Sequence, residues 1–335
     1  MSSVSDRDAG NGARFRPGMP AGHYESWFQR ANHPTRPLGF WIRYTIFAPK
    51  HRPADAEGEL WAIWFDGETG EITAVKENIP VEDCRFGARG IDVVVRDSVL
   101  GADALTGSAS TGSNRIAWKL NYTSPQRPLL LLPEAFYDRG FPKAKALVGS
   151  PGAVYTGTVE INGQSKDVDG WVGSQNHNWG SKHTDAYAWC QVAGFDQAPG
   201  SFLELSTARV RVGPVWTPWM TLAVLRHGGQ EYRLNHLLGA MRAHGAYRPF
   251  EWTFAAKQNG VAVSGRISAT AQQFVGLPYR NPPGGVKTCL NCKIARCEIE
   301  LTVNGGAPVS LVSQHRAAFE ILTDADDHGV PVLDA

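Results

Sequence analysis

The residues best suited to chemistry are concentrated in one short stretch, from Asp169 to His183. It reads Asp-Gly-Trp-Val-Gly-Ser-Gln-Asn-His-Asn-Trp-Gly-Ser-Lys-His, so carboxamides, two histidines and two indoles stand between glycines. A histidine in such a setting can donate a proton, accept one, or orient a water. An indole face can stabilise a carbocation by about 0.5–2 kcal/mol. We therefore take His177 and Trp179 as candidate catalytic residues, with Asn176 beside them as a binding residue.

A third candidate is Glu204, which stands between Leu203 and Leu205. Adding water to an alkene, or cyclising a polyene, begins with protonation of a carbon, and this needs an acid in a dry pocket. Burial raises the pKa of a carboxyl group, so Glu204 could hold its proton near neutral pH. A cycloaddition needs less, namely a shaped apolar cavity and one or two hydrogen-bond donors. His177, Asn176 or Gln191 could supply those donors.

Further binding residues are expected on two strands. Tyr187, Trp189 and Gln191 share one face of a predicted strand, and Glu25 and Trp27 share a face of the first one. We predict that these five side chains bind the substrate.

Each of these candidates also has a purely structural interpretation. The Asn176–Gly180 segment could satisfy buried backbone groups and plug a barrel end. Glu204 could lie on the outward face of a half-buried strand. The strand face that carries Tyr187, Trp189 and Gln191 could fill a core. For Glu25 the favoured alternative is a salt bridge with Arg43. If His177 is functional, it should face a cavity together with Trp179, with a carboxylate or carboxamide within hydrogen-bond reach.

The elements that position these residues are predicted to be strands. Apolar and polar residues alternate in Ile116–Tyr122, and Trp41–Phe47 is aromatic and β-branched. Turn pairs separate many such runs: Asp66-Gly67, Asn162-Gly163, Asn259-Gly260 and Asn304-Gly305, with His227-Gly228-Gly229 between two more. Repeated hairpins at short spacing indicate an all-β fold whose meanders close into antiparallel barrels and so hide their edges.

The length of 335 residues suggests about two domains. We predict a disordered tail over residues 1–20, one barrel over 21–168 and a second over 169–330. The two halves echo each other weakly, since His23–Arg30 followed by Trp41–Phe47 is similar to Ala186–Ala193 followed by Phe202–Val212.

The segment Asn176-His177-Asn178-Trp179-Gly180 resembles the Asn-His-x-Trp-Gly element of the carotenoid 1,2-hydratase superfamily, which includes tocopherol cyclase-like, kievitone hydratase-like and lipocalin-like Diels–Alderase proteins. Tyr187-Ala188-Trp189, Gly194-Phe195-Asp196 and Phe202-Leu203-Glu204 follow in the expected order, and the resemblance covers roughly residues 22–330. It implies two consecutive lipocalin-like (calycin) barrels with an apolar cavity in or between them. It also implies acid catalysis by the positions of His177 and Trp179. The hydratases carry a tyrosine-x-aspartate pair, whereas Phe202-Leu203-Glu204 lacks the phenol, which argues against carotenoid hydration itself.

Composition excludes several functions. Lys+Arg 33 against Asp+Glu 32 gives a formal net charge of +1, so nucleic acid is not an expected partner. There is no Gly-x-Gly-x-x-Gly and no phosphate loop, and we expect no cofactor. Cys289, Cys292 and Cys297 lack a second Cys pair, so we expect no metal, and free thiols there and at Cys84 and Cys190. Met1–Pro20 has no apolar core, which predicts a cytoplasmic location.

Three functions remain open. The first is a cofactor-independent hydratase, cyclase or cycloaddition catalyst, a lyase or isomerase, acting on an isoprenoid or polyketide-like molecule. The second is a carrier that holds a lipid or pigment in the same barrels without chemistry. The third is a structural protein with a filled core. In the first two the partner is a hydrophobic small molecule, with a transient membrane contact as a route for loading it. An ionisable group inside the pocket would separate enzyme from carrier.

Overall fold

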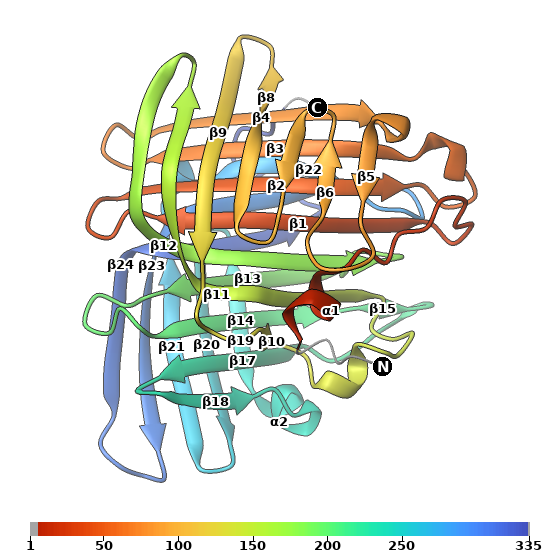
Figure 1. Cartoon of the computed structure of the whole chain (residues 1–335). Helices are drawn as coiled ribbons and strands as arrows, with labels where there is room; N and C mark the ends of the chain where they lie inside the picture. Colours follow the sequence, from red (N-terminus) through yellow and green to blue (C-terminus); the bar gives the residue numbers. More distant parts are fainter. Residues whose placement is uncertain (1–5, 334–335) are drawn as a thin grey trace.

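A computed structural model describes residues 6–333 and shows an all-β protein built on two large sheets (Figure 1). All strand pairs within the sheets are antiparallel. In spatial order sheet A consists of β4 (Glu71–Pro80), β3 (Glu57–Asp66), β2 (Leu38–Ala48), β1 (His23–Asn32), β12 (Gln164–Gly180), β11 (Ala144–Ile161), β9 (Asn114–Thr123), β8 (Ala104–Thr111), β7 (Ser98–Leu100), β6 (Val93–Val95) and β5 (Cys84–Phe86), with β10 (Leu129–Leu130) paired to β11.

Sheet B has the same plan. Its spatial order is β18 (Gln230–Leu234), β17 (Met220–His227), β14 (Phe202–Arg209), β13 (Ala186–Ala193), β24 (Val309–Thr323), β23 (Val286–Val303), β21 (Val261–Ser268), β20 (Glu251–Gln258) and β19 (His244–Arg248), with β22 (Val275–Arg280) paired to β23. In each sheet the first strand pairs with the last, β1 with β12 and β13 with β24. The weak echo between the halves therefore corresponds to β1–β2 and β13–β14.

Smaller elements complete the described chain. They are the helices α1 (Arg7–Asn11) and α2 (Leu237–Arg242), the separate ribbon of β15 (Arg211–Val212) and β16 (Val215–Trp216), and the 3-10 segments Pro53–Asp55, Val81–Asp83, Glu134–Phe136 and Ala271–Gln273. No helix in residues 6–333 is long and apolar enough to cross a bilayer.

The predicted hairpins are confirmed, and the turn residues explain why. Asn162, Asn259 and Asn304 have φ of 51°, 48° and 52°, a left-handed conformation that asparagine tolerates better than most residues. Sheet A is nearly closed, because Lys76 N–H of β4 donates to Thr111 Oγ1 of β8, 2.7 Å away, and this hydroxyl donates back to the Lys76 carbonyl. Two barrel-like sheets are thus what the hairpin pattern predicted.

The division between the sheets differs from the prediction. A boundary at 168/169 would cut through β12, which runs to Gly180 and belongs wholly to sheet A. The chain passes from one sheet to the other between Gly180 and Ala186. The cause is the length of β12: a strand of 17 residues carries the polar stretch as far as Gly180 into the first sheet, where sequence reasoning had placed a domain start.

The predicted disorder of residues 1–20 is wrong for the described part of that segment, while residues 1–5 lie outside the described residues. Helix α1 is capped by Asp6, and Trp27 Nε1 donates to the Asn11 carbonyl at 2.8 Å. The segment is polar because its backbone groups pair with buried side chains of sheet A, which a hydropathy argument does not reveal.

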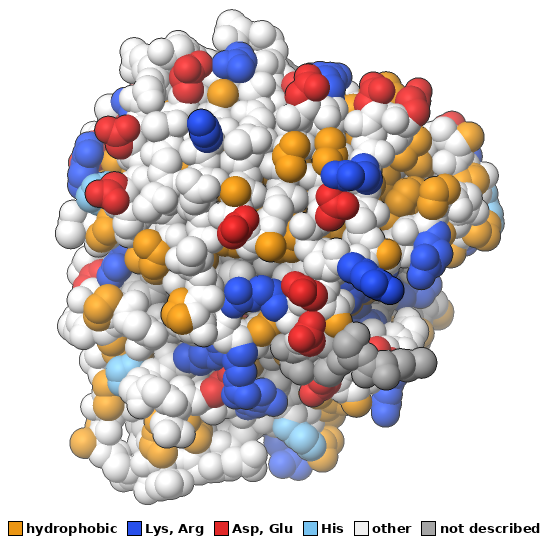
Figure 2. Space-filling model, viewed as in Figure 1, with side chains coloured by type: hydrophobic (Ala, Val, Ile, Leu, Met, Phe, Trp, Pro, Cys, Tyr) orange, Lys and Arg blue, Asp and Glu red, His pale blue; other side chains and the backbone are white. Residues whose placement is uncertain are grey.

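Two large apolar cores and two smaller clusters hold the molecule together. One fills sheet A and includes Trp27, Tyr44 and Trp118. The other fills sheet B and extends to Trp41, Trp61 and Phe65 of β2 and β3, so it also joins the two sheets. On the face in Figure 2, basic and acidic side chains are interspersed. The five cysteines are free, and all except Cys84 are buried.

Candidate active site

Strand alternation divides the polar stretch of β12 between two sites. Asn176 and Asn178 point to one face of the strand, and His177 and Trp179 point to the other. The last residue of the motif, Gly180, must lack a side chain for a steric reason. A Cβ at this position would lie 2.3 Å from the Lys143 carbonyl oxygen. The five-residue motif thus serves two different environments, one on each side of sheet A.

The His177 side is a closed polar cluster around Glu25. His177 Nε2 lies 2.8 Å from Glu25 Oε1, and His177 Nδ1 lies 2.9 Å from the Gly10 carbonyl oxygen. His23 Nε2 lies 3.0 Å from Glu25 Oε2. The backbone N–H of Arg14 donates to both carboxylate oxygens, each at 2.9 Å, and that of Phe15 donates to Oε2 at 2.8 Å.

Aromatic rings close this cluster. Trp27 stacks on His177 with ring centroids 4.7 Å apart, and Trp179 lies at the same distance on a tilted plane. The Arg14 guanidinium sits 4.0 Å above the Trp179 ring. Burial alone would raise the pKa of Glu25, but the hydrogen bonds from His177 and His23 outweigh it and lower the pKa to about 2. Every polar atom of His177 is engaged within the protein, so the ring has no nitrogen left for a ligand.

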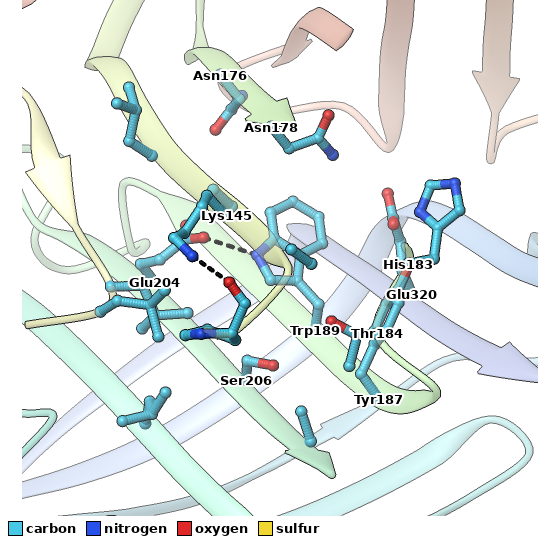
Figure 3. A pocket seen from close by; sticks show the side chains of 18 of the residues that line it. Lys145, Asn176, Asn178, His183, Thr184, Tyr187, Trp189, Glu204, Ser206 and Glu320 are labelled. Carbon is cyan, nitrogen blue, oxygen red and sulfur yellow. Dashed lines mark hydrogen bonds between the residues drawn. The ribbon is translucent and has the colours of Figure 1, made fainter. Parts of the chain in front are cut away.

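The opposite side of β12 borders a pocket of about 200 Å³ between the two sheets (Figure 3). Sheet A contributes Phe28, Trp41 and Asn176 among others, and sheet B contributes Trp189 and Glu204. The remaining lining side chains are mostly apolar or aromatic, including Tyr24, Leu131, Leu132, Leu147, Tyr187, Ala208, Met220, Leu222 and Tyr279. The sequence left open whether the pocket lies in one barrel or between two, and the structure places it between them.

Glu204 is one of two carboxyl groups in the pocket wall, the other being Glu320, and is only 4% exposed. Trp189 Nε1 donates to its Oε1 at 2.7 Å, and Gln191 Nε2 donates to its Oε2 at 2.8 Å (Figure 3 shows the first of these bonds). Burial raises the pKa of Glu204 to about 7, against these two hydrogen bonds and the charge of Arg30, which lower it. Because both oxygens already accept a hydrogen bond from a neutral donor, no cation of the described residues stabilises the carboxylate form from within hydrogen-bond reach.

A buried network fixes this geometry. Gln191 Oε1 accepts hydrogen bonds from Ser174 Oγ at 2.5 Å and from Arg30 NH1 at 3.3 Å. Its amide nitrogen must therefore face the other way, where it donates to Glu204 and to Asn176 Oδ1 at 2.8 Å. Arg30 thus sets the orientation of Gln191, and Gln191 orients the carboxyl group.

The predicted site residues separate into two groups. Asn176, Tyr187, Trp189 and Glu204 line the pocket, and Gln191 lies behind its wall with all its polar atoms used. Glu25, Trp27 and Trp179 lie in the closed cluster on the other side of sheet A, and His177, although it borders the pocket, directs its ring there too. The Glu25–Arg43 salt bridge is wrong: Arg43 points to the opposite face of the sheet and donates to Ser26 Oγ at 2.6 Å.

Sequence reasoning missed several lining residues. They are Trp41, Arg43, Lys145, Asn178, His183, Tyr279 and Glu320. His183 stacks on Tyr24 at 3.7 Å, and burial lowers its pKa to about 3, so the ring is neutral. One signal was available: Arg43 is a single cation inside the apolar run Trp41–Phe47. Asn178 and His183 also belong to the polar stretch Asp169–His183, whereas Lys145, Tyr279 and Glu320 come from other strands and leave no local pattern.

The described residues contain no group of three or more His, Cys, Asp or Glu side chains placed to hold a metal ion. Cys289, Cys292 and Cys297, which are close in sequence, lie on a continuous strand where alternation sends them to different neighbours. Cys289 Sγ lies 3.5 Å from Glu320 Oε2.

No protein-family model matches the chain. An uncharacterized protein of Mycobacterium tuberculosis is 23% identical over 286 residues, which cover 84% of this chain and 82% of the relative. Among solved structures, kievitone hydratase from Nectria haematococca has a TM-score of 0.56 at 12% identity, covering 97% of this chain and 93% of that one. CghA, a Diels–Alderase solved with Sch210972, has a TM-score of 0.59 at 12% identity, covering 93% of this chain and 94% of that one. The two-barrel fold implied by the sequence resemblance is confirmed by these likenesses.

Proposed function

We propose that the protein is a cofactor-independent enzyme of the hydratase or cyclase type, with Glu204 as its acid, acting on an apolar small molecule between the two sheets. The observation that supports this most directly is a carboxyl group with a pKa of about 7 in the wall of a largely apolar pocket. A carrier has no need of such a group, because a buried carboxyl costs binding energy unless it contacts the ligand. A hydratase and a Diels–Alderase share the fold.

The chemistry follows from the position of the proton. The Glu204 proton adds to one carbon of a C=C bond, the π electrons form the new C–H bond, and a carbocation is left on the neighbouring carbon. Trp189, whose indole N–H is fixed on Glu204, also lines the pocket, so its ring is placed to stabilise that cation. In hydration a water oxygen bonds to the cation and its proton returns to Glu204. In cyclisation a second C=C bond attacks, and a proton lost from carbon returns to the carboxylate.

The test is turnover in D₂O. Purified protein is incubated with a panel of linear isoprenoid and polyketide-like alkenes, and products are analysed by mass spectrometry. Hydration adds the mass of heavy water, and cyclisation by protonation incorporates one deuterium. Glu204→Gln should lower the rate by about 10²- to 10⁴-fold. Glu160→Gln, a change of the same type at an exposed ion pair with Arg115, should leave it unchanged.

Two outcomes would contradict the proposal. An unchanged rate in Glu204→Gln would remove the acid from the mechanism. Binding of panel members without any product in the wild type would favour the carrier.

We also propose that the substrate is loaded from a lipid surface through the β15–β16 ribbon. Arg209 and Val210 line the pocket at the base of this ribbon, and its tip exposes Val212, Val215 and Trp216 by 55%, 65% and 39%. Residues 209–220 contain two arginines and no acidic residue. Exposed apolar side chains with adjacent Arg suit an anionic membrane interface.

Co-sedimentation with anionic phospholipid vesicles tests this route of loading. The double substitution Val212→Ser with Val215→Ser should abolish co-sedimentation, and failure of the wild type to sediment would contradict the proposal.

A further inference from the structure

Positive charge in the pocket exceeds the negative charge available to balance it. Arg43, Lys145 and Arg209 all line the pocket, and none of the three has a carboxylate within ion-pair distance among residues 6–333. Lys145 Nζ donates to the Pro142 carbonyl, and the Arg209 guanidinium lies between the rings of Trp216 and Trp219. On the acidic side, Glu204 is half protonated near neutral pH, and Glu320 is already paired.

Arg43 is the most deeply placed of these cations. Arg43 is 4% exposed and Trp41 is 1% exposed, and both line the pocket from the same face of β2. Arg43 makes one hydrogen bond, to Ser26 Oγ, and its buried Nε has no partner. The indole Nε1 of Trp41 is likewise buried without a partner. Two unpaired donors beside one pocket are costly, since a buried polar group without a partner destabilises a fold.

The carboxylates nearest to Arg43 are engaged with other cations. Glu59 pairs with Arg280 at 2.5 Å and with Lys76 at 3.6 Å. Glu320 pairs with the fully buried Lys293 at 2.8 Å. His183, stacked near by on Tyr24, is neutral and changes nothing in this balance. An anion entering the pocket would meet an Arg43 that feels the charges of Glu59 and Glu320 but forms an ion pair with neither, and two N–H donors without an acceptor.

We infer that the apolar molecule bound in this pocket carries an anionic group, a carboxylate or an equally acidic enolate, and that Arg43 with Trp41 Nε1 binds it. This inference rests on the proposed function, since it names the substrate class of the same pocket. The anionic group is held at the β2 side, while Glu204 and Trp189 act on the apolar body from the sheet B side. Charge pairing in a dry site is strong, because water does not screen it there.

Binding of matched probes tests the inference. Dodecanoate, methyl dodecanoate and dodecanol displace the neutral fluorophore N-phenyl-1-naphthylamine from the pocket, and their dissociation constants are compared at pH 8. The wild type should prefer dodecanoate over its methyl ester by about tenfold or more. Arg43→Gln should abolish the preference while the ester binds as before, and Arg43→Lys should retain most of it. Arg115→Gln, at an exposed ion pair, is the matched control and should behave as the wild type.

The outcomes separate cleanly. Equal affinity of acid and ester in the wild type overturns the inference, whatever the variants do. A preference that survives Arg43→Gln but disappears in Lys145→Gln or Arg209→Gln overturns the assignment to Arg43. If Arg43→Gln does not fold, the ratio of the dissociation constants of methyl dodecanoate and dodecanoate in the wild type and in Arg43→Lys decides. Glu204→Gln should keep the preference for dodecanoate even though it loses turnover, so failure of the acid and failure of the anion site are distinguishable.

Discussion

Glu25 and Glu204 are two buried carboxyl groups on neighbouring sheets, and their surroundings move their pKa values in opposite directions. Glu25 accepts two backbone N–H groups and contacts two imidazoles, and its pKa falls to about 2. Glu204 accepts one indole N–H and one amide N–H, both neutral, and burial raises its pKa to about 7. Residue type and burial are the same, so the number and charge of the donors decide which group can give up a proton at neutral pH.

The two sides of sheet A therefore have different roles. The Glu25 cluster is closed by α1 and the chain that follows it, and it holds residues 9–15 on the sheet. The Glu204 side is open to a ligand and leaves donors unpaired. A motif that looks catalytic in the sequence thus has its histidine in the structural cluster and its carboxamides beside the pocket. The following experiments test that contrast.

The largest effect is expected for Glu25→Gln. It leaves two histidines and the backbone N–H groups of Arg14 and Phe15 with a poorer acceptor, and breaking a buried charged cluster costs about 3–5 kcal/mol. Glu204→Gln resembles the neutral acid that burial favours in the folded state, so at pH 7 it should leave the unfolding free energy unchanged or raise it. Urea unfolding of both variants at pH 7 measures the difference. Equal losses would remove the contrast between the two carboxyl groups.

Next in size is an opposite dependence of stability on pH. The pKa of Glu25 is lowered from 4.5 to about 2, so its contribution is present above pH 4.5 and is lost as pH falls towards 2. The pKa of Glu204 is raised from 4.5 to about 7, so the fold favours the neutral acid, and stability declines as pH rises from 4.5 to 7. Each of these two pH-dependent contributions to the unfolding free energy is at most about 3 kcal/mol. The unfolding free energy is measured from pH 3 to 8. In Glu25→Gln its fall at low pH should disappear, and in Glu204→Gln its fall between pH 4.5 and 7 should disappear. A wild-type profile in either variant contradicts the assignment.

His177→Ala should lower the unfolding free energy by about 1–3 kcal/mol, because Glu25 Oε1 and the Gly10 carbonyl lose their partner. Ligand affinity of the folded fraction should be unchanged. Thermal melting and probe displacement on one preparation measure both. A stable variant that has lost binding would show that His177 works in the pocket.

The smallest effect is expected for Trp189→Phe. The phenyl ring keeps much of the packing but removes the indole N–H that donates to Glu204. Losing this bond disfavours the carboxylate, so the pKa of Glu204 should rise further, by roughly 0.7 unit for a bond of about 1 kcal/mol. The alkaline midpoint of the activity profile should move up by that amount. A downward shift would show that the indole does not stabilise the ionised form.

Local sequence patterns predicted the strands and which residues share a strand face, but not the hydrogen-bond and ion-pair partners of the buried side chains. Alternation placed Tyr187, Trp189 and Gln191 on one face of β13, and of these Tyr187 and Trp189 line the pocket together with Glu204, whereas Gln191 lies behind its wall. The same alternation rule divides Asn176 from His177, yet the sequence cannot say which face of β12 meets the second sheet. The partner of Glu25 was misassigned because Arg43 is near in sequence, whereas His177 is 152 residues away.

The sequence by itself determined the hairpins and the antiparallel sheets, because turn residues and two-residue periodicity act over a few residues. Only the tertiary structure decided that β12 belongs to the first sheet, that residues 6–15 close the Glu25 cluster, and that Arg43 and Glu204 line one pocket. These depend on contacts between segments far apart in the chain, where backbone groups and charges find partners that no local pattern encodes.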